Sequence, residues 1–283
     1  MTELDRSLTV LADGAPVTGF RRAYLTGRDA LGLYPMPFTL RLWNISEEGY
    51  LVLCAAKSLS VRHGDSVLAS GSVSDVCRRT VPEGTLTEAV FSAGLGLWET
   101  PVSLSVEAGV SVSETVRKIL DASGTGISLL SFPGEDPVRS RAQAFFGRVA
   151  ECIEEALSAA GARGYLTESG LCVVPPSGLP VSMALSASDL LEDPVFVGKG
   201  LLLLRTRITG WPLGKQVSVK WKDWSQMGLV LERSVDADNM DGKWESELLM
   251  RVGGGILFLP INFSQGSCPG WFRTNNTIHH NLT

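Results

Sequence analysis

Short segments of alternating apolar and polar side chains, separated by glycine-rich turns, constrain the fold of this sequence more than any other feature. Residues 38–43, 59–62 and 217–220 each alternate in this way, which is typical of strands that bury one face. The 30 glycines and the charged content of 19% favour strands and turns over long helices. The pattern predicts a mainly β protein.

Chain length and hydropathy limit the number of domains and exclude some locations. A chain of 283 residues is longer than one ordinary domain, so we expect two or three compact units. No apolar run approaches the roughly 18 residues of a membrane span, and the N-terminus has no apolar signal segment, so we expect a chain that is made in a cytoplasm and does not span a membrane. The longest apolar runs, Leu201–Leu204 and Ile256–Pro260, suit buried strands.

Charge and cysteine usage argue against several functions. Twenty-five basic and 30 acidic residues give a net charge of −5, and the basic residues are scattered, whereas phosphate-binding surfaces need clustered Lys and Arg. The five cysteines form no CxxC pair, so a zinc site or disulfide framework is not expected, and Cys54 and Cys152 are expected to be buried thiols. Only three histidines are present, which leaves few acid–base or metal constellations. We expect no cofactor and no enzymatic activity.

The alternation divides the chain into three regions and a tail. Residues 1–100 are predicted to form a first β-barrel-like domain, in which 38–44 and 51–55 make a hairpin around the turn 46–49. Glycines are expected to break this region into short strands, at Gly71, Gly84, Gly94 and Gly96.

Residues 101–180 change period and are predicted to form an α+β insertion domain of strand, helix, helix and hairpin. Ser111 and Glu114 have the spacing of a capping box before a helix that ends at Gly124. A second helix is expected to bury one face and to end at Gly161, with Phe145, Val149, Cys152, Ile153, Ala156, Leu157 and Ala160 on that face. A hairpin follows over residues 165–174.

Residues 181–252 return to strand patterns and are predicted to form a second β-barrel-like domain. Its strands are expected at 201–206, 217–220, 228–232 and 247–252, with a turn over 236–242. Residues 253–255 resemble a linker, and residues 264–283 are polar, Asn-rich and without periodicity, so we expect residues 253–283 to be a C-terminal tail that is flexible or bound to a partner.

Two sets of residues are candidate sites. Acidic residues around the 236–242 turn have part of the spacing of a calcium loop, but Met240 occupies a ligand position and Gly242 falls one residue late; the set is Asp236, Asp238, Asp241 and Glu247. A solvated turn is the simpler interpretation. Glu151, Glu154 and Glu155 are expected on the polar face of a helix, where acids only solvate the surface.

Four tryptophans are candidate interface anchors: Trp43, Trp221, Trp224 and Trp244. Packing in a hydrophobic core is the alternative role for about half of the tryptophans in the chain.

Four stretches, in this order, resemble the central hub proteins of phage tails and baseplates, a family that includes Mu-type hubs, late-control proteins and the N-terminal hub region of type VI spike proteins. They are residues 38–44, 109–120, 164–174 and 238–247, within a resemblance that covers about residues 5–252. Residues 253–283 have no counterpart.

The resemblance implies a structural protein of the virion rather than an enzyme. Such hubs are homotrimers whose barrel-like domains form a six-fold-like ring, which joins a hexameric tail tube or distal tail protein to a spike or fibre, with the tape-measure protein as a further neighbour. Two other functions are compatible with the residues alone. A carbohydrate-binding β module would use the tryptophans as sugar platforms, and a tail-associated wall hydrolase would need paired acids in a cleft.

Overall fold

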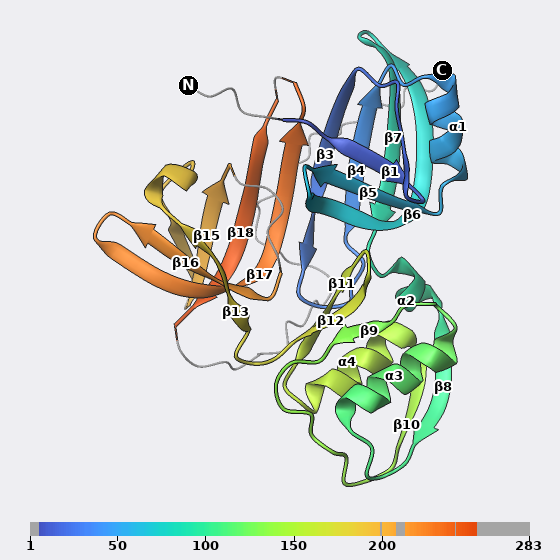
Figure 1. Ribbon diagram of the computed structural model, residues 1–283, viewed down its shortest axis with the longest axis vertical. Helices are drawn as coiled ribbons and strands as arrows, with labels where there is room; N and C mark the ends of the chain where they lie inside the picture. The colour runs from blue at the N-terminus through green and yellow to red at the C-terminus, as the bar shows by residue number, and fades with distance from the viewer. Residues whose placement is uncertain (1–5, 199, 208–212, 241, 254–283) are drawn as a thin grey trace, which may run out of the picture.

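The computed structural model of the protein describes residues 6–198, 200–207, 213–240 and 242–253. Figure 1 shows three lobes: a first β lobe in blue to cyan, an α+β lobe in green, and a second β lobe in gold to red. Strands dominate, and the helices gather mainly in the α+β lobe, which confirms a mainly β fold with an α+β insertion. Among the described residues, no helix combines the length and the apolar character that a membrane crossing requires.

The first β lobe is a curled antiparallel sheet with the strand order β3-β4-β7-β6-β5-β1-β2. Alternation explains its core, since Phe38, Leu40 and Leu42 are buried while the residues between them are not. Its strands are β1 (Thr9–Ala12), β2 (Ala15–Pro16), β3 (Arg22–Ala30), β4 (Pro37–Trp43), β5 (Ser58–His63), β6 (Ser66–Val81) and β7 (Gly84–Ser92).

The predicted hairpin around residues 46–49 is wrong, because this segment begins a helix, α1 (Glu47–Ala55). The Ser46 side chain accepts a hydrogen bond from the Gly49 amide at 3.1 Å, and acidic residues occupy the first turn, where they favour a helix N-terminus. The helix buries Leu53 but leaves Leu51 and Cys54 exposed, so the expected burial of Cys54 is also wrong.

Gly71 does not end a strand, contrary to the sequence prediction. It lies within the 16-residue strand β6, where a Cβ atom would come within 2.2 Å of the Ser92 carbonyl carbon of β7. Glycine is needed at this position because the two backbones approach too closely for any side chain.

The α+β lobe packs helices against two small sheets, β10-β8 and β11-β12-β9. Ser111 caps α3 by accepting from the Glu114 amide at 3.3 Å, and Gly124 ends this helix in the left-handed region, as predicted. The elements are α2 (Leu95–Glu99), β8 (Pro101–Val106), α3 (Val112–Ser123), β9 (Leu129–Ser131), β10 (Gln143–Arg148), α4 (Val149–Ser158), β11 (Arg163–Thr167) and β12 (Gly170–Val174).

The predicted second helix starts later than expected, at Val149, and Phe145 lies on β10 instead. Phe145 is buried all the same, because strand alternation turns it towards the lobe's core while Phe146 points outwards and is 87% exposed. Cys152 is buried on α4 as expected.

The second β lobe contains β13 (Leu179–Leu185), a short 3-10 helix η1 (Ala187–Asp189), β14 (Val195–Gly198), β15 (Leu201–Thr206), β16 (Lys215–Trp221), β17 (Trp224–Asp238) and β18 (Trp244–Val252). Strand β17 is common to both β lobes. It pairs with β16 and β18 in the second lobe, and its residues 232–238 pair with β3 of the first. The two β lobes therefore belong to one 13-stranded sheet (Figure 1). The domain limits drawn from the sequence at residues 100, 180 and 252 stay predictions, and the tail expected from 253 lies, but for Gly253, outside the described residues.

The loop between β3 and β4 connects the three lobes. Leu31 packs against the core of the second β lobe, whereas Leu33 lies in the core of the α+β lobe. The Leu33 backbone is held on both sides, because its amide donates to the Glu154 carboxylate at 2.9 Å and its carbonyl accepts from the Trp98 indole. Glu154 is thus a structural contact between lobes and not only a solvated acid.

Candidate assembly surface

Trp221 and Trp224 face each other across the tip of the β16–β17 hairpin, whose turn is Lys222–Asp223. Lys222 adopts a left-handed backbone conformation with φ 51°, and its Nζ lies 5.1 Å from the Trp221 ring centroid. Both tryptophans are only partly buried. The hairpin therefore presents aromatic side chains near the surface, and their role as interface anchors stays a prediction.

The hairpin tip contacts the segment around β14. Phe196 meets the Trp224 ring edge-on, with centroids 6.0 Å apart, and Lys222 pairs with Asp193 at 3.3 Å. This neighbourhood holds four of the exposed large apolar side chains in the described part of the chain: Leu191, Val195, Phe196 and Val197. Such clustering indicates a contact surface rather than scattered exposure. We call these four residues with Trp221 and Trp224 the β14 patch.

Trp43 and Trp244 lie elsewhere. The Trp43 ring is partly buried in the first β lobe, with the Arg22 guanidinium 4.9 Å from its centroid. Trp244 is buried in the core of the first β lobe, although β18 belongs to the second, and its ring contacts His63 at 5.1 Å. The structure therefore brings together only two of the four tryptophans chosen from the sequence.

Two of the four acidic residues with calcium-like spacing contact protein groups. Asp236 accepts from the Tyr24 hydroxyl at 2.6 Å, and Asp238 forms an ion pair with Arg22. Burial alone would raise the pKa of Asp238, but the hydrogen bonds from Arg22 and the Met240 amide lower it below its ordinary value. Glu247 lies on β18, where burial raises its pKa, and Asp241 lies outside the described residues.

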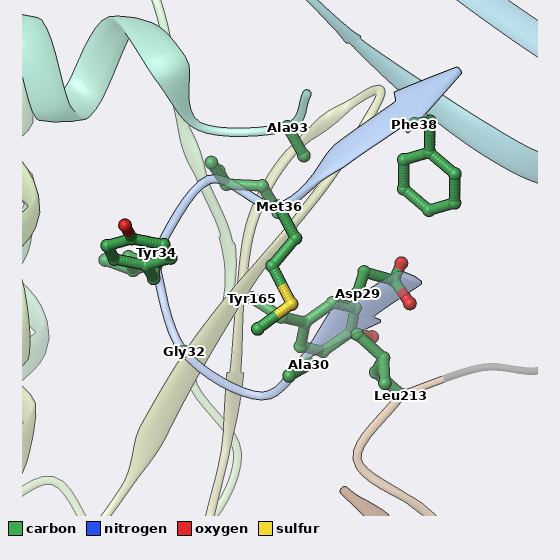
Figure 2. A pocket seen from close by; sticks show the side chains of 11 residues that line it. Asp29, Ala30, Gly32, Tyr34, Met36, Phe38, Ala93, Tyr165 and Leu213 are labelled. Atoms are coloured by element: carbon green, nitrogen blue, oxygen red, sulfur yellow. The ribbon is translucent and has the colours of Figure 1, made fainter. Parts of the chain in front are cut away.

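A groove of about 410 Å³ separates the first β lobe from the tip of the β11–β12 hairpin. Glu168 bridges it, since its carboxylate accepts from the Ser60 hydroxyl at 2.8 Å and pairs with Arg62. A second cavity, at the junction of the lobes, measures only about 20 Å³, which is room for roughly one water molecule. Figure 2 shows Met36 extending along it towards Tyr165, so this cavity is a packing junction and not a ligand site.

The sequence did not reveal the exposed residues whose exposure depends on where their strand lies in the sheet. Val195, Phe196 and Val197 form no alternating pattern, and only the sheet order shows that they lie on an edge strand. The exposure of Phe146 was missed for a similar reason, because the helix was expected to start too early. The three consecutive apolar residues at 195–197 were the available signal for the edge.

No model of a known protein family matches the sequence, and no curated protein matches it. Solved structures do match, over most of this chain.

The matching folds are those of phage tail proteins. A tail protein from Neisseria meningitidis has a TM-score of 0.63 at 11% identity, covering 86% of this chain and 95% of its own. The 43 kDa tail protein of prophage MuSo2 from Shewanella oneidensis has a TM-score of 0.62 at 10% identity, covering 87% and 96%.

A third structure with a similar fold is a component of a secretion system. The E. coli protein c3393, a component of the type VI secretion system with structural similarity to the T4 tail proteins gp27 and gp5, has a TM-score of 0.64 at 12% identity, covering 87% of this chain and 77% of its own. The chain thus has the fold of phage tail proteins and of a related type VI component, which agrees with the resemblance seen in the sequence.

Proposed function

We propose that the protein is a non-enzymatic structural hub of a phage tail tip or baseplate, located in the virion. In this proposal three copies form a ring that joins a hexameric tail tube to a spike or fibre. The fold shared with phage tail proteins supports a structural role in a tail. The arrangement of the two β lobes supports the trimer and its partners.

The observation that carries the proposal is the sharing of β17 by both β lobes. Residues of this strand pair with β16, β18 and β3, so the two barrel-like bodies are fixed side by side by backbone hydrogen bonds. Three copies of a chain with two such bodies provide six positions around a ring. This arrangement can match a six-fold tube on one side and a three-fold spike on the other.

The β14 patch supplies apolar surface for contacts between copies or with tail partners. Phe196 is 56% exposed and its ring contacts that of Trp224. Tryptophan and phenylalanine are enriched in interface cores, where their burial strengthens association. The rings of Trp221 and Trp224 are already approached by Lys222 and Phe196, which disfavours flat sugar platforms.

Solution mass and co-assembly test this function. A hub is expected to show about three times the 30.3 kDa of one chain, alone or after mixing with a hexameric tail tube protein. The double variant Trp221→Ser, Phe196→Ser should weaken that assembly by tenfold or more, whereas Leu51→Ser on the distant helix α1, also exposed, should leave it unchanged. A monomer that does not bind the tail tube protein and instead binds glycans would contradict the proposal.

A further inference from the structure

The groove between the first β lobe and the tip of the β11–β12 hairpin has a floor of hydroxyl groups. Four serines of β5 and β6 lie there in two cross-strand pairs, Ser58 with Ser72 and Ser60 with Ser70. Leu59, between two of them on β5, is buried in the core, so strand alternation turns the serines outwards. We call these four residues the serine floor. In the described part of the chain, the hydroxyls of Ser70 and Ser72 make no hydrogen bond to another protein group.

The opposite wall of the groove is held in place by apolar packing. Tyr165 of β11 packs against a buried cluster that contains Leu229 and Leu231 of the second β lobe. The neighbouring Leu166 lies against Gly94, where an added Cβ atom would come within 2.8 Å of the leucine side chain. The groove is therefore formed without a ligand, and its volume of about 410 Å³ falls within the roughly 300–1,000 Å³ of small-molecule sites.

The charges in the groove favour a neutral ligand. Among the described residues that line it, only Arg62 and Glu168 are charged, and they pair with each other. Their side chains are 33% and 31% exposed, so both remain accessible to a ligand. An anion would be repelled by the Glu168 carboxylate, and a cation by the Arg62 guanidinium. A neutral ligand that both donates and accepts hydrogen bonds suits both groups.

The floor of the groove offers side chains rather than backbone for recognition. Strand β5 already pairs with β1 on one side and with β6 on the other, so a peptide cannot add to it as a further strand. Serine hydroxyls both donate and accept hydrogen bonds, as the hydroxyl groups of a sugar do. Leu11, Ile127 and Leu166 add apolar surface to the same groove. Sugars combine hydroxyl groups with apolar C–H faces, and this lining provides for both.

We propose that this groove binds a neutral oligosaccharide. The serine floor and the Arg62–Glu168 pair make hydrogen bonds to its hydroxyl groups, and the apolar side chains contact the C–H faces of its rings. Binding is weak, with a Kd of about 1 mM, because each hydrogen bond to the sugar replaces one to water. The proposal does not rest on the hub function, since the groove lies within one chain, and its failure would leave the assembly test unaffected.

Saturation-transfer NMR and isothermal titration of the full chain test the site. The neutral probes are maltotriose, cellotriose and triacetylchitotriose, and the charged comparisons are 3′-sialyllactose and trilysine. At least one neutral probe should bind with a Kd of about 1 mM, and both charged compounds about fivefold more weakly or less. Absence of binding by all three neutral probes at about 10 mM would overturn the proposal, and so would tighter binding of either charged compound.

Three variants assign the binding to the groove. Ser70→Leu places a bulky side chain on the serine floor and should lower the affinity for the neutral probe about tenfold or more. Thr80→Leu, at an exposed position near the other end of β6, is the matched control and should leave the affinity unchanged. Equal affinity in these two variants would place the sugar elsewhere and overturn the assignment.

The third variant, Glu168→Gln, lies on the exposed hairpin tip and tests the charge argument without altering the floor. It removes the negative charge, so binding of 3′-sialyllactose should strengthen about threefold or more relative to the neutral probe. An unchanged ratio of the two affinities would contradict the selection of a neutral ligand by the Arg62–Glu168 pair.

Discussion

Arg233 of β17 and Asp29 of β3 form a two-pronged ion pair across the seam between the β lobes. Nε lies 2.7 Å from Oδ1, and a second guanidinium nitrogen lies 2.9 Å from Oδ2. The same guanidinium also donates to the Leu68 carbonyl at 3.1 Å. The arginine thus connects β17 to two strands of the first lobe.

Removing this arginine should destabilise the protein. The Arg233 side chain is 11% exposed and that of Asp29 is 22% exposed, so Arg233→Ala leaves a poorly solvated carboxylate without its main partner. We expect a loss of about 3 kcal/mol in the free energy of unfolding, measured by urea denaturation. Lys222→Ala removes the exposed pair with Asp193 and should cost less than about 0.5 kcal/mol. Equal losses in the two variants would contradict this account.

Truncation of the two adjacent phenylalanines on β10 should change the free energy of unfolding by very different amounts. Phe145→Ala empties a buried position in the α+β core and should cost about 3 to 5 kcal/mol. Phe146→Ala changes a side chain that is 87% exposed and should alter stability by less than about 0.5 kcal/mol. Thermal or urea unfolding of the two variants checks the assignment of this segment to a strand, and similar losses would argue against it.

Gly71 should not tolerate a methyl group. In Gly71→Ala the new Cβ would lie 2.2 Å from the Ser92 carbonyl carbon, so β6 and β7 must move apart, at a cost of about 1 to 3 kcal/mol. Gly96→Ala is the matched control, because no atom lies within 4 Å of its added Cβ and the residue lies in α2. It should stabilise the chain by about 0.5 kcal/mol through lower unfolded-state entropy. The two unfolding midpoints should move in opposite directions.

Alkaline pH should destabilise the fold through Tyr24. Burial, and then the hydrogen bond to Asp236, raise the pKa of Tyr24 from 10.0 to about 12. The folded state therefore holds this proton more strongly than the unfolded chain, so the stabilisation is complete below pH 10 and is lost as the pH rises towards 12. Tyr24 is partly exposed, so we discount the effect to about 1 kcal/mol.

The measurement is the free energy of unfolding between pH 9 and 12. Tyr24→Phe should make the decline over this range shallower, whereas Tyr34→Phe, at a side chain that is 62% exposed, serves as the control. Burial also raises the pKa of Tyr165 to about 12, so some decline should persist in both variants. An unchanged slope in Tyr24→Phe would refute the role of this residue.

Much of the fold was predictable from the spacing of apolar residues along the sequence and from helix-capping residues. The alternation at residues 38–43 and 217–220 predicted strands, and Ser111 with Gly124 bounded a helix correctly, because these signals act within a few residues. The hairpin predicted around residues 46–49 was wrong because two local signals conflicted in residues 46–55. Their apolar run suggested a strand, while the local cap at Ser46 determined a helix.

The candidate surface was only half predictable. Trp221 and Trp224 lie at a hairpin tip near the surface, but Trp244 was not distinguishable from them in the sequence, since its burial depends on a neighbouring lobe. The same applies to Leu31 and Leu33, whose opposite contacts follow from where three lobes meet. Patterns within a segment indicate which face of a strand is apolar, but not which distant body covers it.

The shared strand β17 has a mechanical consequence. A force that separates the two β lobes must rupture the ladder between β17 and β3, seven paired residues from Glu232–Ala30 to Asp238–Tyr24, and cannot act on a soft linker. Strain applied to one lobe is therefore transmitted through backbone hydrogen bonds to the other. The two β lobes should move together as one stiff body.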